Sequence, residues 1–302
     1  MTANNVFQLN TGQTIPAIGL GTWQSKPNEV YHAVLAALES GYRHIDTAYV
    51  YRNEKQVGQA IKDSGIPRDQ LFITTKLWNT SHRPELVASA LEQSLDNLQL
   101  DYIDLYLMHW PIAFQPSERM VPKDENGEIA LDSVDFCATY AAMEKLDKKK
   151  VRAIGVSNFS IPNLQKLLAT AKIIPAVNQV ELHPYLPQKE LLKFCHEENI
   201  HVTAYSPLGS TDSPLIQEPI VLEVANKYNT TPAQVLISWG IQRKCSVIPK
   251  SVTPSRIKQN KETIQLELSD IQRLDQLSQS EHARRLVDPS PFWKSDIFHS
   301  KL

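Results

Sequence analysis

Short apolar segments alternate with longer amphipathic segments along almost the whole chain. The apolar segments have the length of buried strands, and the segments between them repeat apolar residues at helical spacing. Eight strands are predicted, at residues 19–23, 44–48, 71–77, 102–109, 151–157, 176–181, 201–205 and 245–249. Strict alternation of strand and helix over this length predicts an α/β fold, a (β/α)8 TIM barrel rather than an open sheet.

The remaining segments predict helices and two additions at the ends of the chain. Helices are expected at residues 27–40, 54–62, 84–97, 133–146, 161–170, 187–197, 219–227 and 232–241, near 254, and at 269–277. Residues 1–18 predict an N-terminal β-hairpin, and 288–302 predict an irregular C-terminal loop without a helix, because prolines interrupt it. No shift in composition divides the chain, so we expect one domain over residues 1–302.

Composition and charge exclude several classes of protein. The 302 residues carry 31 basic and 33 acidic side chains, a formal net charge of −2 without long blocks of one sign. This balance argues against nucleic-acid partners and against a polybasic membrane anchor. No apolar run is long enough to cross a bilayer, and the first ten residues do not resemble a signal peptide. Three well-separated cysteines fit a reducing, cytoplasmic setting.

Polar residues recur where the predicted strands end. In a barrel of this type the C-terminal ends of the strands form the reactive face. The residues at these ends are Asp46, Lys76, His109, Ser157, Asn158, Gln179, Tyr205, Ser206, Lys250 and Ser251. Their recurrence at one end of consecutive strands predicts a site there.

Each of these residues alone also fits a structural role. Asp46 is consistent with capping a turn, and Tyr51, which lies before the helix that Asn53 is expected to cap, is consistent with packing. Lys76 is consistent with a solvated strand end and His109 with a satisfied core histidine. It is their recurrence at one end of consecutive strands that predicts a site.

Five motifs together resemble the aldo-keto reductase family. They are Gly41-Tyr-Arg-His-Ile-Asp-Thr-Ala48 with Tyr51, Leu107-Met-His-Trp-Pro111, Gly155-Val-Ser-Asn-Phe159, Tyr205-Ser-Pro-Leu-Gly209 and Ile248-Pro-Lys-Ser251. They occur in the family's order over essentially the whole chain. Within the family, the chain is most similar to the fungal NADP-dependent aldehyde reductases and glycerol dehydrogenases.

The resemblance implies a catalytic tetrad of Asp46, Tyr51, Lys76 and His109. Tyr51 is expected to be the general acid that protonates the carbonyl oxygen. Lys76 is expected to lower the pKa of this phenol, and Asp46 to keep Lys76 protonated. His109 is expected to orient the carbonyl.

The same resemblance implies NADP(H) as the cofactor. The residues expected to bind it are Thr22, Trp23, Asp46, Ser157, Asn158, Gln179, Tyr205, Ser206, Leu208, Ser210, Lys250, Ser251, Val252, Thr253, Arg256, Gln259 and Asn260. Arg256 and Lys250 supply donors suited to a 2′-phosphate, which favours NADP over NAD. The pair Gly19 and Gly21 lacks the third glycine of a Rossmann turn.

The substrate pocket is expected to be aromatic, and its variable wall is expected to come from the tail. The residues expected to contact substrate are Trp23, Tyr51, Trp78, His109, Trp110, Phe292 and Trp293, with Trp293 or Phe292 opposite Trp23. No metal is expected, because His196 and His201 lack a carboxylate partner at metal spacing.

These expectations combine into one function with two alternatives. The predicted enzyme reduces aldehydes or ketones to alcohols with NADPH, including glycerol, glyceraldehyde or dihydroxyacetone interconversion, or reduction of xenobiotic carbonyls and ketoesters. We expect a cytoplasmic monomer whose partner is a small-molecule carbonyl or alcohol. The alternatives are a Schiff-base aldolase or isomerase that uses Lys76, and a non-catalytic NADP-binding regulatory module.

Overall fold

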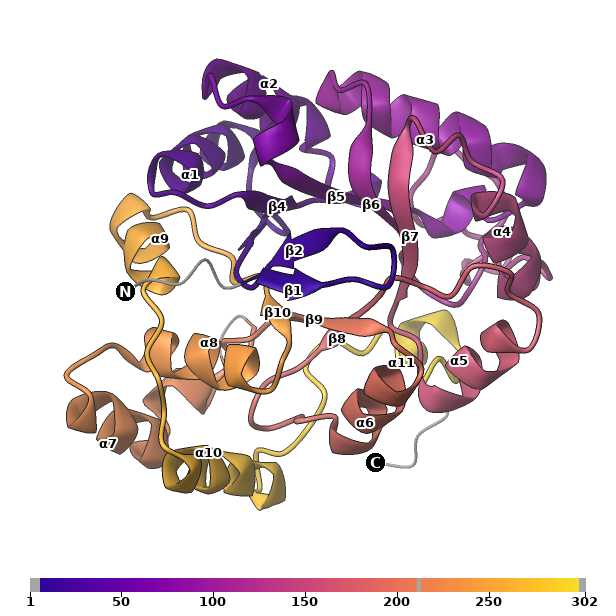
Figure 1. Cartoon of the computed structure of the whole chain (residues 1–302). Helices are drawn as coiled ribbons and strands as arrows, with labels where there is room; N and C mark the ends of the chain where they lie inside the picture. The colour runs from indigo at the N-terminus through magenta and orange to yellow at the C-terminus, as the bar shows by residue number, and fades with distance from the viewer. Residues whose placement is uncertain (1–5, 211–212, 299–302) are drawn as a thin grey trace.

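The computed structural model describes residues 6–210 and 213–298 (Figure 1). The predicted hairpin region 1–18 and tail 288–302 each extend past these limits, so residues 1–5 and 299–302 lie outside the described part of the chain.

A single parallel sheet forms the centre of the fold. In the described part of the chain its eight strands are β3 (Leu20–Gly21), β4 (His44–Asp46), β5 (Phe72–Leu77), β6 (Ile103–Met108), β7 (Val151–Ser157), β8 (Val177–Glu181), β9 (His201–Tyr205) and β10 (Ser246–Val247). They pair in chain order from β3 to β10. Parallel bridges from Ile18 to Val247 and from Gly21 to Lys250 join the first strand to the last. The sheet therefore closes, and the prediction of an eight-stranded α/β barrel is confirmed.

The two strands at the closing seam are shorter than predicted. β3 and β10 each retain two residues of the five expected, because they meet through separate bridges and not through a continuous ladder. Backbone hydrogen bonds nevertheless cross the seam between the first and last strands. Gly19 N donates to Val247 O at 2.8 Å, and Gly21 N donates to Pro249 O at 3.1 Å.

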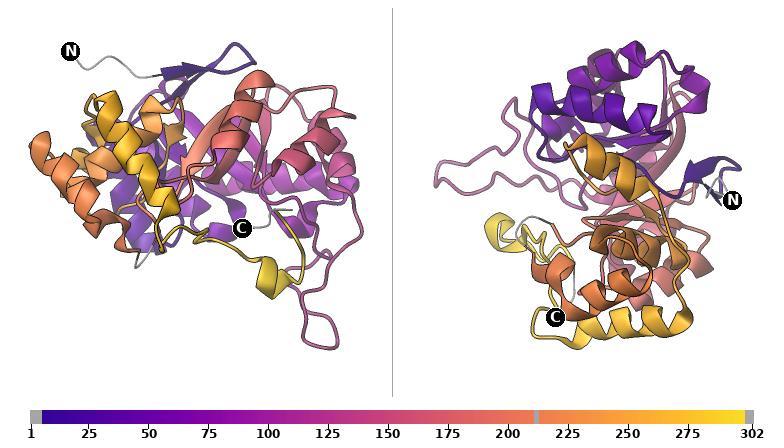
Figure 2. Two further views of the ribbon diagram at one scale, coloured as in Figure 1. Left: turned by 90° about the horizontal axis from the view of Figure 1, so that it is seen from below. Right: turned by 90° about the vertical axis from the view of Figure 1, so that its left-hand side faces the viewer.

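Helices surround the barrel, apart from the last one, which lies beyond one end of it (Figure 1 and Figure 2). The surrounding helices contribute many of the buried apolar residues of the core. The helices are α1 (Pro27–Glu39), α2 (Glu54–Asp63), α3 (Pro84–Leu98), α4 (Phe136–Met143), α5 (Ile161–Leu168), α6 (Lys189–Glu197), α7 (Pro219–Lys227), α8 (Pro232–Gln242), α9 (Pro254–Lys261), α10 (Leu268–Asp275) and α11 (Ser290–Trp293). Five 3-10 turns lie in connecting segments of the described residues: η1 (Tyr49–Tyr51), η2 (Arg68–Gln70), η3 (Asn79–Ser81), η4 (Pro214–Gln217) and η5 (Gln276–Gln279). In α2, for example, Val57 and Ile61 lie four residues apart and both are buried in the core.

The N-terminal hairpin closes one end of the barrel. β1 (Val6–Gln8) pairs antiparallel with β2 (Thr14–Pro16), as predicted. Leu9 and Ile15 are buried in a small cluster with Leu105, Ala153 and Val177 from the barrel strands. The hairpin and the C-terminal segment lie at opposite ends of the molecule in the left view of Figure 2. The hairpin end is therefore filled, and the other end remains for a site.

The C-terminal tail contains a short helix, so the prediction of an irregular tail was wrong for this part. The prolines that argued against a helix lie at its start: Pro289 is the N-cap of α11, and Pro291 lies in its first turn, where backbone amides need no helical acceptor. Asp288 Oδ1 accepts a hydrogen bond from Ser290 N at 2.9 Å and stabilises the same turn. Local capping therefore formed a helix that periodicity did not indicate.

Candidate active site

The four residues of the expected tetrad come from three consecutive strand ends. Asp46 ends β4, Lys76 lies on β5, and His109 directly follows β6. Tyr51 is placed by the 3-10 turn η1, which ends at Arg52 in the left-handed conformation with a φ of 59°. Tyr51 and His109 meet edge to face with ring centroids 5.8 Å apart. The structure thus brings together side chains that the sequence separates by up to 63 positions.

Asn53 is the N-cap residue of α2, as predicted, but its side chain has another role. The side chain makes no capping hydrogen bond. Instead, Asn53 Nδ2 donates to Thr22 O at 3.0 Å and to Ser25 O at 3.2 Å, and Thr47 Oγ1 donates to Asn53 Oδ1. The amide therefore joins the loop after β3 to the strand end that carries Asp46, which a local sequence pattern cannot indicate.

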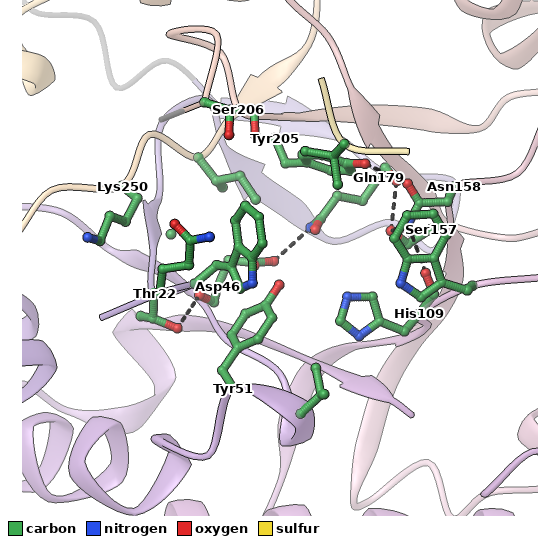
Figure 3. A pocket seen from close by; sticks show the side chains of 18 of the residues that line it. Thr22, Asp46, Tyr51, His109, Ser157, Asn158, Gln179, Tyr205, Ser206 and Lys250 are labelled. Atoms are coloured by element: carbon green, nitrogen blue, oxygen red, sulfur yellow. Dashed lines mark hydrogen bonds between the residues drawn. The ribbon is translucent and has the colours of Figure 1, made fainter. Parts of the chain in front are cut away.

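A fully buried ion pair lies beneath the phenol. Lys76 Nζ donates to Asp46 Oδ1 at 2.6 Å and to Thr47 O at 2.8 Å. Gln179 Nε2 donates to the other carboxylate oxygen of Asp46 at 2.7 Å (Figure 3). Because both carboxylate oxygens and the ammonium have close partners, the arrangement favours the charged forms. Burial acts in the opposite direction, lowering the pKa of Lys76 and raising that of Asp46.

Tyr51 and His109 are neutral groups in this environment. Burial, the Asp46 carboxylate and Tyr205 raise the pKa of Tyr51 well above its ordinary value. Burial, Lys76 and His82 lower the pKa of His109 well below its ordinary value. A protonated phenol and an uncharged imidazole are therefore present together at neutral pH.

The pKa of Tyr51 is raised, whereas Lys76 was expected to lower it, because burial outweighs any effect of the ammonium in this pocket. The ammonium lies 5.2 Å from the centre of the phenol ring, but Asp46, in contact with it, carries the opposite charge. Loss of hydration is the largest cause of the upward shift in the pKa of Tyr51, and the Asp46 carboxylate and Tyr205 add to it.

The predicted cofactor residues on β7, β8 and β9 form one connected network. Tyr205 Oη donates to Asn158 Oδ1 at 2.8 Å, and Asn158 Nδ2 donates to His109 O at 2.9 Å. Ser157 Oγ donates to Gln179 O at 2.8 Å. Asn158 has a φ of 66°, so the backbone leaves β7 in a left-handed turn. The side chains of Ser157, Asn158, Gln179 and Tyr205 gather on one side of the pocket, across from Tyr51 (Figure 3).

An aromatic cluster forms the substrate side. Trp293 packs edge to face on Trp110 at 5.1 Å and on Phe114 at 5.0 Å, and it approaches Trp78 at 6.4 Å. Trp23 is 40% exposed and lies outside this cluster. Trp293 thus contacts Trp110 and Phe114, because the tail folds toward the loop after β6. Trp23, Phe292 and Trp293 all line the same cavity, and the placement of Trp293 or Phe292 opposite Trp23 stays a prediction.

These groups surround one cavity of about 730 Å³, within the usual range for ligand sites. All seven predicted substrate residues line it, as do the predicted cofactor residues from Thr22 to Lys250. The six residues predicted beyond Lys250 do not line it and continue from it along the next loop and α9: Ser251, Val252, Thr253, Arg256, Gln259 and Asn260.

Two simpler interpretations fail on this geometry. Lys76 is fully buried and lies behind the cavity lining, so it is not a solvated strand end. His109 lines the cavity, and its Nδ1 has no hydrogen-bond partner among the described residues, so it is not a satisfied core histidine.

Sequence reasoning missed several lining residues. Val50, Pro207, Val287, Asp288 and Pro289 all border the cavity. Val50 and Pro207 are immediate neighbours of residues that were predicted, and that adjacency was the available signal. Asp288 and Pro289 belong to the tail that was expected to form the variable wall, and Val287 directly precedes it, but none of the three was singled out, because their position depends on how the tail folds back.

Two features of the described part of the chain concern metal ligands and membrane spans. No three or more His, Cys, Asp or Glu side chains are arranged there to hold a metal ion. None of the helices described is both long enough and apolar enough to cross a bilayer.

A closed barrel with a buried Lys–Asp pair, a protonated phenol and a neutral imidazole in one apolar cavity defines an α/β-barrel enzyme equipped for acid–base chemistry on a small molecule. Comparison with known proteins agrees. The profile of the aldo/keto reductase family matches residues 17–213. Glycerol 2-dehydrogenase (NADP(+)) of Saccharomyces cerevisiae is 53% identical over 304 residues, covering 96% of each chain.

Other relatives are similar over comparable lengths. Aldehyde reductase YPR1 of S. cerevisiae is 48% identical, covering 93% of each chain. The aldose reductase structure from Schistosoma japonicum superposes with a TM-score of 0.92 at 42% identity, covering 97% of each chain. The chain therefore belongs to the aldo/keto reductase family.

Proposed function

We propose that the protein reduces aldehydes and ketones to alcohols with NADPH, and that Tyr51 is the general acid. The observation that carries this proposal is the position of the Tyr51 phenol, beside His109 in the cavity and above the buried pair of Asp46 and Lys76. Acid–base groups in this arrangement suit protonation of a carbonyl oxygen.

Each member of the tetrad has a role that follows from its environment. Tyr51 is protonated at neutral pH, since its pKa is raised above an ordinary value that already lies above neutrality, and it therefore has a proton to donate. As the proton leaves, a negative charge develops on the phenol, and the Lys76 ammonium lies close enough to stabilise it. Asp46, held by Gln179, keeps the ammonium in place. His109 is neutral and lines the same cavity, so it orients the carbonyl without competing for its proton.

The cavity also fits a nicotinamide dinucleotide. Ser157, Asn158 and Gln179 offer hydroxyl and amide groups that suit a carboxamide, and Tyr205 offers a ring for stacking. Ser206, Leu208 and Ser210 continue the lining toward Lys250. When bound, the cofactor supplies the hydride. The name of the yeast glycerol 2-dehydrogenase supports NADP(H) in particular.

The adenosine end is proposed to lie against the loop after β10 and the start of α9. Lys250 and Arg256 are both exposed and provide two cations for a 2′-phosphate. The remaining residues proposed for this end are Ser251, Val252, Thr253, Gln259 and Asn260.

The substrate side favours uncharged carbonyl compounds with an apolar body. Its walls are Trp23, Trp78, Trp110 and Trp293, and the tail contributes the carboxylate of Asp288. We propose aromatic and aliphatic aldehydes, ketones and ketoesters as substrates. Interconversion of glycerol with glyceraldehyde or dihydroxyacetone is supported by the name of the yeast relative.

The alternative of a Schiff-base enzyme requires a reachable lysine. Lys76 is fully buried, and its ammonium donates to Asp46 and Thr47, which opposes attack on a carbonyl. Borohydride trapping with a carbonyl substrate tests this alternative directly: the proposed reductase gives no covalent adduct at Lys76.

The experiment that tests the proposed function is a substrate panel. Purified protein is given aldehydes, ketoesters and sugars with NADPH or NADH, and glycerol with NADP, while absorbance at 340 nm is followed. Turnover of aldehydes with NADPH supports the proposal. Cofactor binding without any turnover identifies a regulatory module instead. We further propose that the chain acts as a cytoplasmic monomer, since one chain supplies the whole tetrad and its cysteines are free.

A further inference from the structure

A buried carboxylate outside the tetrad holds the tail against the barrel. Glu181 is the last residue of β8 and is fully buried. Its Oε1 accepts a hydrogen bond from Leu286 N at 2.7 Å, and its Oε2 accepts one from Val287 N at 2.8 Å. We call residues 286–298 the C-terminal wall. Both oxygens of Glu181 therefore bind consecutive amides at the first two positions of this wall.

His183 completes the set of donors around this carboxylate. Its Nε2 lies 2.8 Å from Glu181 Oε1, and this ring is also fully buried. Because an ionised carboxylate only accepts hydrogen bonds, the ring carries its proton on Nε2. With three donors on two oxygens, the geometry of the carboxylate is fixed.

The second clamped residue and residues after it form part of the cavity. Val287, Asp288 and Pro289 line it, and so do Phe292 and Trp293 in α11. At the other end of the wall, Asn163 Nδ2 donates to Ile297 O at 3.0 Å. The wall is thus attached at both ends, with its cavity-lining residues between them.

The strand that carries the clamp also carries a tetrad contact. Gln179 lies two residues before Glu181 on β8, and it donates to Asp46. Residues two apart on a strand point to the same face. The same short segment of β8 therefore holds Asp46 of the tetrad, through Gln179, and the C-terminal wall, through Glu181.

We propose that Glu181 is a positioning residue that sets specificity for carbonyl substrates with bulky apolar bodies, by clamping the C-terminal wall at Leu286 and Val287. This inference rests on the proposed reductase function. A substrate too small to reach the wall does not depend on the clamp, whereas a bulky one binds between the wall and the tryptophans. The clamp therefore acts on the KM of bulky substrates and not on the chemical step.

The test compares Glu181→Gln with a matched control, Asp104→Asn. The glutamine replaces one acceptor oxygen with an NH2 group that faces a backbone amide. Asp104 is also a buried barrel carboxylate that accepts a backbone amide, from Ile73 at 2.9 Å, but it lies near the start of β6, away from the cavity lining. For each variant, kcat and KM are measured for propanal and 2-naphthaldehyde. Hydrogen exchange of the peptide containing Leu286 and Val287 is measured by mass spectrometry.

The expected result separates the two substrates. In Glu181→Gln the KM for 2-naphthaldehyde rises about tenfold, the size of one lost charge-assisted hydrogen bond, while kcat for both substrates and the KM for propanal stay within about twofold. Exchange at 286–287 becomes faster. Asp104→Asn changes neither the ratio of the two KM values nor this exchange.

Three results overturn the inference. Unchanged exchange at 286–287 shows that Glu181 does not clamp the wall. Faster exchange with an unchanged ratio of KM values shows that the clamp does not set specificity. Equal losses of activity toward both substrates in both variants show that the two buried carboxylates contribute only to stability.

The test also gives an answer if the wild-type protein is inactive or if the variant does not fold. If the wild-type protein reduces neither aldehyde, the proposed function is wrong. The exchange measurement then still shows whether Glu181 holds Leu286 and Val287. If Glu181→Gln does not fold by circular dichroism, His183→Leu, which removes a single donor, replaces it with the same expected and overturning results.

Discussion

Replacing Asp46 with asparagine should lower the free energy of unfolding by about 3–5 kcal/mol, the usual cost of removing one partner from a buried ion pair. The change keeps the size of the side chain and retains an oxygen for Gln179. It removes the negative charge that lies 2.6 Å from Lys76 Nζ. The ammonium, fully buried, then keeps Thr47 O as its remaining close acceptor.

The magnitude follows from the distance and the burial. At 2.6 Å and an effective dielectric constant of about 20, the attraction between the two charges is about 6 kcal/mol. Relaxation and partial neutralisation of Lys76 recover part of this. An exposed pair with the same separation provides the control: Lys150 Nζ lies 2.6 Å from Glu92, with side chains 41% and 49% exposed. Glu92→Gln should lower the free energy of unfolding far less than Asp46→Asn, because water and salt screen an exposed ion pair.

The loss of unfolding free energy caused by Asp46→Asn should become smaller as the pH rises. Burial already lowers the pKa of Lys76, and the Asp46 charge opposes that shift. Without Asp46 the folded pKa falls further, while the unfolded value stays near about 10.4. Between these two values the unfolded chain binds more protons, so the stability of the variant increases with pH.

Urea unfolding followed by circular dichroism, from pH 7 to pH 10, measures these quantities for the wild type and both variants. A loss in Asp46→Asn no larger than that in Glu92→Gln at pH 7 would refute the reasoning, because it would mean that the buried pair is not ionised. A loss that does not change with pH would refute the proposed cause.

Two further predictions concern recognition. Arg256→Ala should raise the Kd for NADPH roughly ten- to a hundredfold and leave that for NADH nearly unchanged, because one charge-assisted contact to the 2′-phosphate is lost. Fluorescence titration measures both constants, and equal weakening would assign Arg256 a structural role. Asp288→Asn should raise kcat/KM for 4-carboxybenzaldehyde by about two- to fivefold, the size of a partly screened repulsion, and leave 4-nitrobenzaldehyde unchanged. An equal response of the two aldehydes would show that the Asp288 charge does not act on the substrate.

The sequence predicted the fold well because the barrel repeats one local pattern. Each strand is an apolar run and each helix an amphipathic one, so eight repeats identified the architecture without knowledge of any contact. The same regularity placed Asp46, Lys76 and His109 at strand ends. The errors arose where pairing or capping was not local. β3 and β10 are shorter because they close the barrel on each other, and α11 forms where prolines occupy its first turn.

The site was predictable in its members but not in its interactions. The resemblance to a family named Gln179 as a cofactor residue, but its contact with Asp46 depends on the register of strands that are distant in sequence. The pKa of Tyr51 depends on burial, which spacing does not reveal. Glu181 gave no signal, because its partners are backbone amides more than one hundred positions away.

The most direct test of the proposed mechanism is the reduction of an aldehyde by Tyr51→Phe under saturating NADPH, with the Kd for NADPH measured in parallel. The phenol acts on the substrate oxygen, so kcat should fall by roughly a hundredfold or more, while the Kd stays within about threefold of the wild-type value. Retention of more than about a tenth of the wild-type kcat would contradict the assignment of Tyr51 as the general acid.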